Sequence, residues 1–179
     1  MKELSLHLLD LIENSIEAGA KNIFIEINKN KEKTVLRIVD DGKGIPEDVL
    51  RDITNPFTTT RRTRKVGLGI SLFNEVITNC GGKLNIKSKV GEGTELISEF
   101  PSNHIDLPPW GNLADTIYAL IVTHPEINFN FKIKTEKGSF EISTEDIKSK
   151  LGGDNSFFDP EVIRFIKSYL NQNLGGIGI

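Results

Sequence analysis

The chain has very little cysteine, and this scarcity excludes a fold stapled by its own disulfides. Its 179 residues include one cysteine, Cys80, so we expect a reducing, cytoplasmic setting and interpret Cys80 as a free structural thiol. The sequence also has no apolar run near the roughly 20 residues that cross a bilayer. Its first residues show no cleavable signal pattern. We therefore expect no membrane partner.

A surplus of basic residues is absent as well. The formal net charge is −3 at pH 7, and the isoelectric point is about 5.7. Because general nucleic-acid binders normally carry a positive surplus, nucleic acid is not an expected partner. Locally the balance differs, since four cations stand within five residues of an aperiodic segment, at Arg61, Arg62, Arg64 and Lys65.

Hydrophobic periodicity predicts an α+β fold over residues 1–101. Apolar residues at helical spacing alternate with segments of strict apolar–polar alternation, which predict strands. Their order predicts a two-layer sandwich in which helices cover one face of a mixed sheet. The expected elements are a first helix ended by Gly19, strands at Asn22–Asn28 and Thr34–Asp40, a helix from Pro46, a helix at Ile70–Cys80, and strands at Lys83–Lys89 and Thr94–Phe100.

The remaining residues predict a smaller α/β accessory region. Residues 102–111 are rich in proline and polar residues, and they read as a linker or as a strap packed down by Ile105, Leu107 and Trp110. For residues 112–179 we expect a frayed terminal tail and a last helix whose apolar face either packs internally or docks a partner. The expected elements are a helix at Leu113–Thr123, strands at Asn128–Thr135 and Ser139–Ser143, a helix at Thr144–Lys150, and a helix from Pro160 to about Gln172.

The first helix has one apolar side and one polar side. Asp10 and Asn14 are four residues apart, so their side chains project in nearly the same direction and can face one small ligand. An ordinary solvated helix face has the same pattern. His7 falls on this polar side, where we expect a surface histidine or a hydrogen bond to Asp10.

Several motifs in a fixed order resemble one nucleotide-binding superfamily. They are "ENSIEAGA", "DDGKGI", "NPFTTT", "GLG" and "GEGT". Together they resemble the GHKL ATPases, which include type II topoisomerases, a heat-shock chaperone, mismatch-repair ATPases and histidine kinases. The resemblance covers residues 1–101 and implies the Bergerat fold. It is closest to the catalytic domain of sensor histidine kinases, with a first helix like that of mismatch-repair ATPases.

The resemblance implies that ATP and Mg²⁺ are the cofactors. Asn14 corresponds to the asparagine whose oxygen binds Mg²⁺, a hard ion that takes few protein ligands in phosphate sites. Asp40 corresponds to the carboxylate that accepts a hydrogen bond from the adenine amine, and Thr94 to the threonine that reaches the adenine directly or through water. Gly42 and Gly44 permit positive φ and a close approach of the backbone to the purine. Ile45 is expected to line the same site.

The phosphate end of the site is expected at Gly67, Leu68 and Gly69, just before a helix N-terminus, where free N–H groups and the helix dipole attract phosphate oxygens. The basic segment that precedes them is interpreted as a lid that orders on the phosphates. Within it Arg62 and Lys65 are candidate ligands of the nucleotide. The resemblance also assigns Phe57, as an anchor of the lid, and Thr58 to the nucleotide site.

Asp10 departs from the pattern of the kinases. Four residues before the magnesium asparagine, topoisomerases and mismatch-repair ATPases have a glutamate that acts as general base, whereas histidine kinases commonly have asparagine. A hydroxyl or water nucleophile must lose a proton, so a carboxylate helps; a neutral imidazole needs no such help. Asp10 keeps the acid but reaches about 1.5 Å less far, by one C–C bond.

Three functions therefore stay open at this stage. The first is a kinase-like protein that transfers the γ-phosphate in trans to a side chain of a partner protein. The second is a conformational switch in which water is the only acceptor, which Asp10 favours. The third is an anti-sigma-type regulator that binds its target with little turnover. The resemblance implies a partner protein and leaves a homodimer open.

Overall fold

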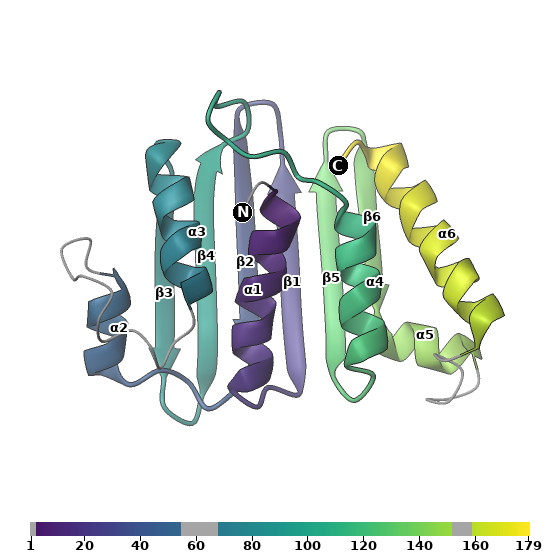
Figure 1. The fold of residues 1–179 in the computed structure, drawn as a ribbon, viewed down its shortest axis with the longest axis horizontal. Coiled ribbons are helices and arrows are strands. Elements are labelled where there is room, and N and C mark those ends of the chain that lie inside the picture. The colour runs from purple at the N-terminus through teal and green to yellow at the C-terminus, as the bar shows by residue number, and fades with distance from the viewer. Residues whose placement is uncertain (1–2, 55–67, 152–158) are drawn as a thin grey trace.

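The computed structural model describes residues 3–54, 68–151 and 159–179, which form a six-stranded sheet covered by helices on one face (Figure 1). This confirms the predicted α+β class and the mixed sheet. The described elements are α1 (Leu4–Glu17), β1 (Asn22–Lys29), β2 (Lys33–Asp40), α2 (Glu47–Thr54), α3 (Leu68–Asn79), β3 (Lys83–Lys89), β4 (Gly93–Pro101), α4 (Leu113–Thr123), β5 (Asn128–Thr135), β6 (Gly138–Ser143), α5 (Thr144–Leu151) and α6 (Pro160–Ile177).

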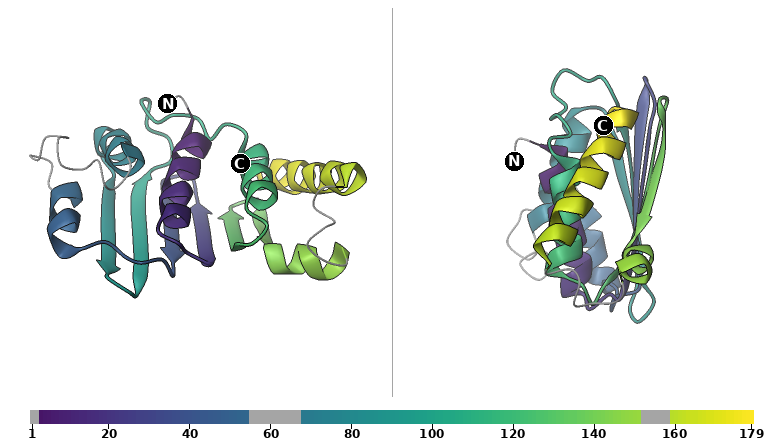
Figure 2. Two further views of the ribbon diagram at one scale, coloured as in Figure 1. Left: turned by 60° about the horizontal axis from the view of Figure 1, so that its bottom comes forward. Right: turned by 90° about the vertical axis from the view of Figure 1, so that its right-hand side faces the viewer.

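The strands lie in the order β3-β4-β2-β1-β5-β6. Strands β1 and β5 are parallel, and the other neighbouring pairs are antiparallel. Helices α1, α3, α4 and α6 lie on the same side of the sheet, as the two views in Figure 2 show. Helix α1 packs between α3 and α4 over the centre of the sheet.

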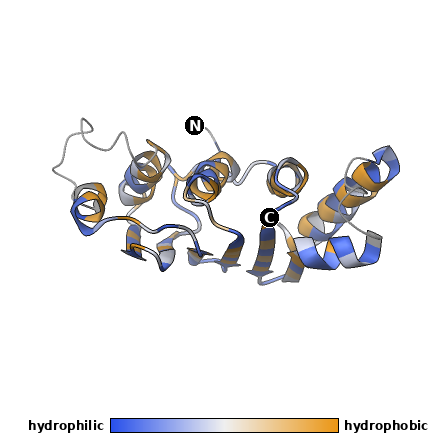
Figure 3. Ribbon diagram, turned by 90° about the horizontal axis from the view of Figure 1, so that it is seen from below, coloured by the Kyte–Doolittle hydropathy of each residue, from blue (hydrophilic) through white to orange (hydrophobic). Residues whose placement is uncertain are grey.

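Alternation along each strand explains why one face of the sheet is covered. In β1 the residues Ile23, Ile25 and Ile27 are buried under the helices, while the intervening side chains face away. Figure 3 shows the same alternation as bands of opposite hydropathy along β5 and β6. A two-residue period places every second side chain on one face, so these strands need a helical layer on that face alone.

Strands β5 and β6 extend the sheet of the first hundred residues. The register pairs Ile25 of β1 with Ile38 of β2 on one side and with Phe131 of β5 on the other. All three side chains are buried in a single hydrophobic cluster. The sheet and its core therefore run across the predicted boundary near residue 101.

Residues 102–112 cross the N-terminal end of α1 as a strap. The backbone N–H of Leu4 donates to the Pro109 carbonyl at 2.8 Å, and that of Ser5 to the Trp110 carbonyl at 3.0 Å. The first N–H groups of a helix lack intrahelical partners, so these carbonyls satisfy two of them. Leu107 and Trp110 pack against the core, as expected. The expectation for Ile105 is wrong, since its side chain is 95% exposed.

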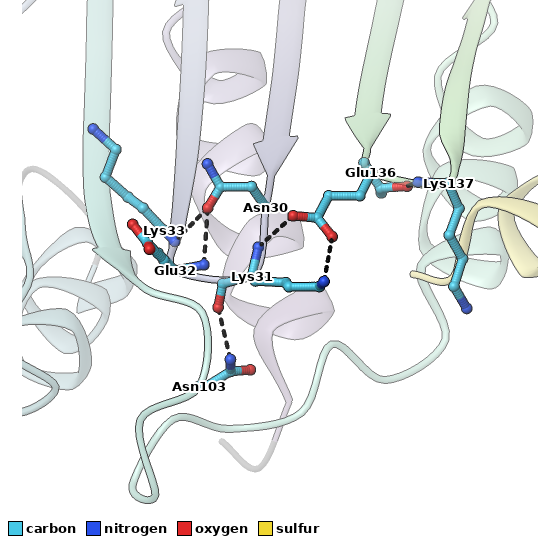
Figure 4. Close-up of polar contacts among 8 residues, drawn as sticks. Asn30, Lys31, Glu32, Lys33, Asn103, Glu136 and Lys137 are labelled. Atoms are coloured by element: carbon cyan, nitrogen blue, oxygen red, sulfur yellow. Dashed lines mark hydrogen bonds and ion pairs between the residues drawn. The ribbon is translucent and has the colours of Figure 1, made fainter.

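A polar cluster links the strap to the β1–β2 turn and to the β5–β6 turn, which lie at the same end of the sheet (Figure 4). The Lys31 N–H donates to the Glu136 carboxylate at 3.3 Å, which joins the β1–β2 turn to the β5–β6 turn. The Asn103 amide donates to the Lys31 carbonyl at 2.6 Å. Asn30 closes its own turn by accepting from the N–H groups of Glu32 and Lys33.

Helix α6 is longer than the sequence predicts. We expected it to end near Gln172 before a frayed tail, but it continues to Ile177. Leu174 and Ile177 are buried, and the Thr135 hydroxyl donates to the Ile177 carbonyl at 2.6 Å. Gly178 then ends the helix with a φ of +73°. The expectation of fraying is therefore wrong, because apolar contacts hold the last turn on the sheet.

Among the helices that the structure describes, none is both long and apolar enough to cross a membrane. Cys80, at the end of α3, is buried as a free thiol. Burial raises the pKa of this thiol, and a buried thiol of raised pKa is poorly reactive.

Candidate functional site

A cleft of about 380 Å³ opens between α1, the ends of β2 and β4, and the segment from Lys43 to Val49. Its size is within the range of sites for small molecules and cofactors. Its walls are mostly apolar with a few polar groups. The lining residues are Leu11, Asn14, Ser15, Glu17, Ala18, Ile38, Asp40, Lys43, Gly44, Ile45, Pro46, Val49, Ile70, Thr94 and Leu96.

Asp40 is a buried carboxylate at one end of this cleft, with 7% of its surface exposed. The Ser15 hydroxyl donates to its Oδ2 at 2.7 Å, and the Gly42 N–H donates to its Oδ1 at 2.9 Å. Burying an ionised carboxylate is costly unless donors face it. These two donors supply that compensation, and they leave Asp40 able to accept further hydrogen bonds from a ligand.

Thr94 lies beside Asp40, because the two residues are direct partners in the β2–β4 register. Its hydroxyl is hydrogen-bonded to that of Ser88 at 2.8 Å. Ser88 also accepts from the Ile45 N–H at 2.8 Å. Ile45, Thr94 and Asp40 are therefore brought together in one part of the cleft.

Of the two glycines in "DDGKGI", only Gly44 has the positive φ that the sequence predicts. Gly44 has a φ of +71°, as predicted, and a Cβ there would lie 2.1 Å from the Lys89 carbonyl oxygen. It therefore serves the close approach of this loop to the β3–β4 turn. Gly42 is not among the glycines with positive φ. A Cβ at Gly42 would instead lie 2.9 Å from the Ala18 Cβ, so this position serves the contact with the end of α1.

Asn14 lies in the wall of the cleft on α1. Its Nδ2 donates to the Asp10 carbonyl one turn earlier at 2.9 Å. A carbonyl oxygen cannot donate, so this bond fixes which side of the amide carries the nitrogen. The Asn14 Oδ1 is thereby left as an acceptor, which suits a hard cation or a bound water.

The start of α3 contacts α1 at Asp10 and Asn14, the two polar residues that we expected to share one face of the first helix. A Cβ at Gly69 would lie 2.9 Å from the Asp10 Cβ and 3.4 Å from the Asn14 Nδ2. Only glycine permits this approach, and it brings the N-terminal turn of α3 next to Asn14. Gly69 lies within the helix, which begins at Leu68, rather than just before it as we expected. The Leu68 side chain is 62% exposed and is not part of the cleft wall.

Asp10 and His7 of α1 do not line the cleft. Asp10 lies beside Gly69 but is not among the lining residues. His7 is buried, with 1% of its surface exposed, so the expectation of a surface histidine is wrong. Its ring lies 5.9 Å from that of Phe73 on α3, and within the described residues neither ring nitrogen has a hydrogen-bond partner. Burial lowers the pKa of His7.

The predicted residues of the basic segment lie outside the described residues. They are Phe57, Thr58, Arg62, Lys65 and Gly67, together with Arg61 and Arg64. Across the described ranges, no group of three or more His, Cys, Asp or Glu side chains is arranged to hold a metal ion.

Sequence reasoning missed two serines of the site, Ser15 and Ser88. Ser15 follows Asn14 directly, and Ser88 occupies a helix-facing position in the alternation of β3. A serine at such positions is a weak signal on its own, because small hydroxyl residues are common on strands and helices. The partner of Ser88 becomes visible only when the register of the sheet is known, and that of Ser15 only when the packing of α1 on the sheet is known.

The chain is similar in sequence to a family of ATPases and to bacterial sensor proteins and kinases. The family "Histidine kinase-, DNA gyrase B-, and HSP90-like ATPase" matches residues 2–104, more than half of the chain. A putative sensor protein of Shewanella frigidimarina is 33% identical over 99 residues, which are 53% of this chain and 15% of that protein. Sporulation kinase D of Bacillus subtilis is 30% identical over 97 residues, which are 52% of this chain and 19% of the kinase. The chain thus spans less than a fifth of either relative.

Among solved structures, the N-terminal domain of a DNA repair protein matches with a TM-score of 0.58 at 16% identity. The match covers 92% of this chain and 59% of that one, so it extends beyond residue 104 and shows the fold. Together with the cleft, these findings confirm the superfamily that the motifs indicate. The chain belongs to the family of histidine kinase-, DNA gyrase B- and HSP90-like ATPases, and it carries an ATP-binding domain of the kinase-like kind.

Proposed function

We propose that the chain binds Mg-ATP in the cleft beside α1 and transfers the γ-phosphate in trans to a side chain of a partner protein. One observation carries the proposal. A single cleft is lined by Asp40 and Thr94 of the sheet, by Asn14 of α1, and by Ile70 in the first turn of α3. A purine base and a magnesium-bound triphosphate require groups of these kinds.

In this proposal the adenine lies at the Asp40 end. Asp40 accepts from the exocyclic amine, while its bonds from Ser15 and Gly42 hold the carboxylate in place. Ile38, Ile45 and Leu96 supply the apolar walls for the flat base. Burial of these surfaces would contribute about 25 cal/mol per Å² of apolar area removed from water.

The triphosphate is proposed to lie against the first turn of α3, where unpaired N–H groups and the helix dipole favour anions. The geometry of Asn14 fits a magnesium ion there, since its amide nitrogen is committed to Asp10 and its oxygen is free to bind the metal. When bound, Mg²⁺ would neutralise phosphate charge and keep several of its waters. From the sequence alone, Arg62 and Lys65 are candidate phosphate ligands.

Transfer to another chain is supported by the positions of the histidines. The chain has three, and none of them lines the cleft. His7 is buried in α1, His104 lies in the strap, and His124 lies near Glu13 and Glu126. Sporulation kinase D, which is 30% identical to this chain over 97 residues, is itself a kinase.

ATP hydrolysis is the second candidate, and Asp10 favours it. Its Cβ lies against the start of α3, one turn from Asn14. A carboxylate there can take the proton of an attacking water, directly or through a second water. In this case ATP would operate a conformational switch instead of phosphorylating a partner.

The experiment that separates the two uses γ-³²P-labelled ATP and Mg²⁺. The chain is incubated alone and with the protein that co-purifies with it, and protein-bound label and free phosphate are both measured. The proposal predicts label on the second polypeptide. Free phosphate alone, at the same rate with and without the partner, would contradict transfer and support hydrolysis.

A further inference from the structure

Ser88 joins three separate segments at the base end of the cleft. It lies on β3, where the register pairs it with Thr94 on β4, and Thr94 is paired in turn with Asp40 on β2. Asp40, Thr94 and Ser88 therefore form a row across three strands. The Ser88 Oγ is 2.8 Å from the Thr94 Oγ1, 2.9 Å from the Gly93 carbonyl oxygen and 2.8 Å from the Ile45 N.

The chemistry of these contacts fixes the direction of each hydrogen bond. A serine hydroxyl has one proton to donate and two lone pairs. The Gly93 carbonyl can only accept, so the Ser88 proton goes to it. The Ile45 N–H can only donate. The remaining contact must therefore have Thr94 as donor and Ser88 as acceptor, and the hydroxyl of Ser88 is fully used.

The direction of these bonds decides what Thr94 can offer to a ligand in the cleft. The single proton of Thr94 is committed to Ser88, so Thr94 presents only lone pairs to a ligand. Asp40, already holding two donors, also presents only lone pairs. Opposite side chains on neighbouring strands lie about 5 Å apart at Cβ. The two residues thus form an all-acceptor pair, which suits an amino group on a purine and disfavours an oxygen at the same place.

We propose that Ser88 is a positioning residue that sets selectivity for a 6-amino over a 6-oxo purine nucleotide, by holding the Thr94 hydroxyl as an acceptor. The inference rests on the proposed function, since it needs a purine at the Asp40 end. Ser88 itself acts through Thr94 and through the loop that begins at Ile45. Without Ser88, the Thr94 proton becomes free to donate to an oxygen on the ligand.

The test compares the affinities of ATP and ITP, which carry an amine and an oxygen at purine C6. The measured quantity is the ratio of the Kd for ITP to the Kd for ATP, from calorimetry with Mg²⁺. In Ser88→Ala this ratio should fall about tenfold, the effect of one hydrogen bond gained or lost. Ser88→Thr keeps a hydroxyl on a strand residue and should keep the wild-type ratio.

Two further variants separate positioning from general damage. Thr94→Val removes the acceptor, so it should lower the ratio by a similar factor, and adding Ser88→Ala in that background should change nothing more. Ser98→Ala is the matched control, because Ser98 is another hydroxyl on the helix-facing side of the sheet, bonded at 3.3 Å to the Lys83 carbonyl. This variant should keep the wild-type ratio.

A wild-type ratio in Ser88→Ala or in Thr94→Val would overturn the inference, even with ATP binding intact. If Ser88→Ala does not fold, a wild-type ratio in Thr94→Val is still sufficient to overturn the inference. Failure of the proposed function would give a different result. The wild-type chain would then bind neither nucleotide, or Asp40→Asn would leave the affinities for ATP and ITP unchanged. Either result would remove the inference as well.

Discussion

At the scale of single residues, the site depends on a hydroxyl and a backbone N–H that hold the Asp40 carboxylate in place. Asp40 is a charge in a mostly apolar cleft, and a buried carboxylate without donors would cost several kcal/mol or take up a proton. The Ser15 hydroxyl and the Gly42 N–H provide charge-assisted hydrogen bonds, the stronger kind. The Asp40 carboxylate is therefore held in place with lone pairs left to accept from a ligand.

Asn14→Ala tests the proposed metal ligand. We expect the affinity for ATP in the presence of Mg²⁺ to fall by about tenfold or more, since one strong contact to the ion is lost, and the affinity measured in EDTA to change little. Asn171→Ala is the matched control, because Asn171 makes the same bond to the carbonyl four residues earlier on an exposed face of α6, at 2.9 Å. Unchanged magnesium dependence in Asn14→Ala would refute the assignment.

Because His7 is buried, we expect the free energy of unfolding to decrease in mild acid. Burial holds the pKa of the folded state below the ordinary value of 6.5, so below that pH the unfolded chain takes up a proton that the folded chain does not. The free energy of unfolding therefore decreases as the pH falls from 6.5, by at most about 1.4 kcal/mol per pH unit. His7→Leu should lessen this decrease in urea unfolding between pH 6.5 and 5. Equal slopes in variant and wild type would show that His7 is not responsible.

The residues of the site differed in how far the sequence could predict them. Asp40, Gly44 and Thr94 stand in contiguous motifs, so their proximity in the fold follows from the resemblance. Ser15 and Ser88 could not be found that way, since their roles depend on partners 25 and 6 positions away. The expectation for His7 was wrong because a helical wheel assumes one packed side, whereas α3 covers a second side of α1.

At the scale of elements, local signals fixed several boundaries well. Helix α4 begins at Leu113, as predicted, and the Asn112 side chain caps it by accepting from the Asp115 N–H at 3.0 Å. Strand β5 also has its predicted limits. The end of α6 was misjudged because Gly175 and Gly176 disfavour helix. Burial of Leu174 and Ile177 outweighs that preference, and Gly178 caps the end.

Leu174→Ala tests whether the last turn of α6 belongs to the core. Its side chain is 2% exposed, so truncation should cost about 2–5 kcal/mol of unfolding free energy. Leu72→Ala is the control, since that leucine is 43% exposed on α3 and its truncation should cost about 0.5 kcal/mol or less. Urea denaturation followed by circular dichroism measures both. Similar small losses in the two variants would mean that the tail is frayed after all.

At the scale of the whole molecule, one sheet links the ATP-binding part to the accessory region. The parallel pairing of β1 with β5 could not be derived from local pattern, because a strand's neighbours depend on how the chain crosses the sheet. The strap and the cluster around Lys31 add polar links between the two parts. Residues 1–101 and 112–179 therefore share a core, although the sequence divides them.

We accordingly expect the chain to unfold in a single cooperative transition. Trp110, the one tryptophan, packs in the strap, so its fluorescence reports on the junction of the two parts. Fluorescence and far-ultraviolet circular dichroism should give the same urea midpoint, the standard sign of a two-state transition. Two separated midpoints would support the division into independent folding units.

The central claim is that the cleft beside α1 binds Mg-ATP with its base at Asp40. Calorimetry with a non-hydrolysable ATP analogue and Mg²⁺ tests it most directly, using the wild-type chain and Asp40→Asn. The account predicts one site per chain in the wild type and a loss of affinity of about tenfold or more in the variant, since one charged hydrogen bond is removed. No heat of binding in the wild type, or undiminished affinity in Asp40→Asn, would contradict it.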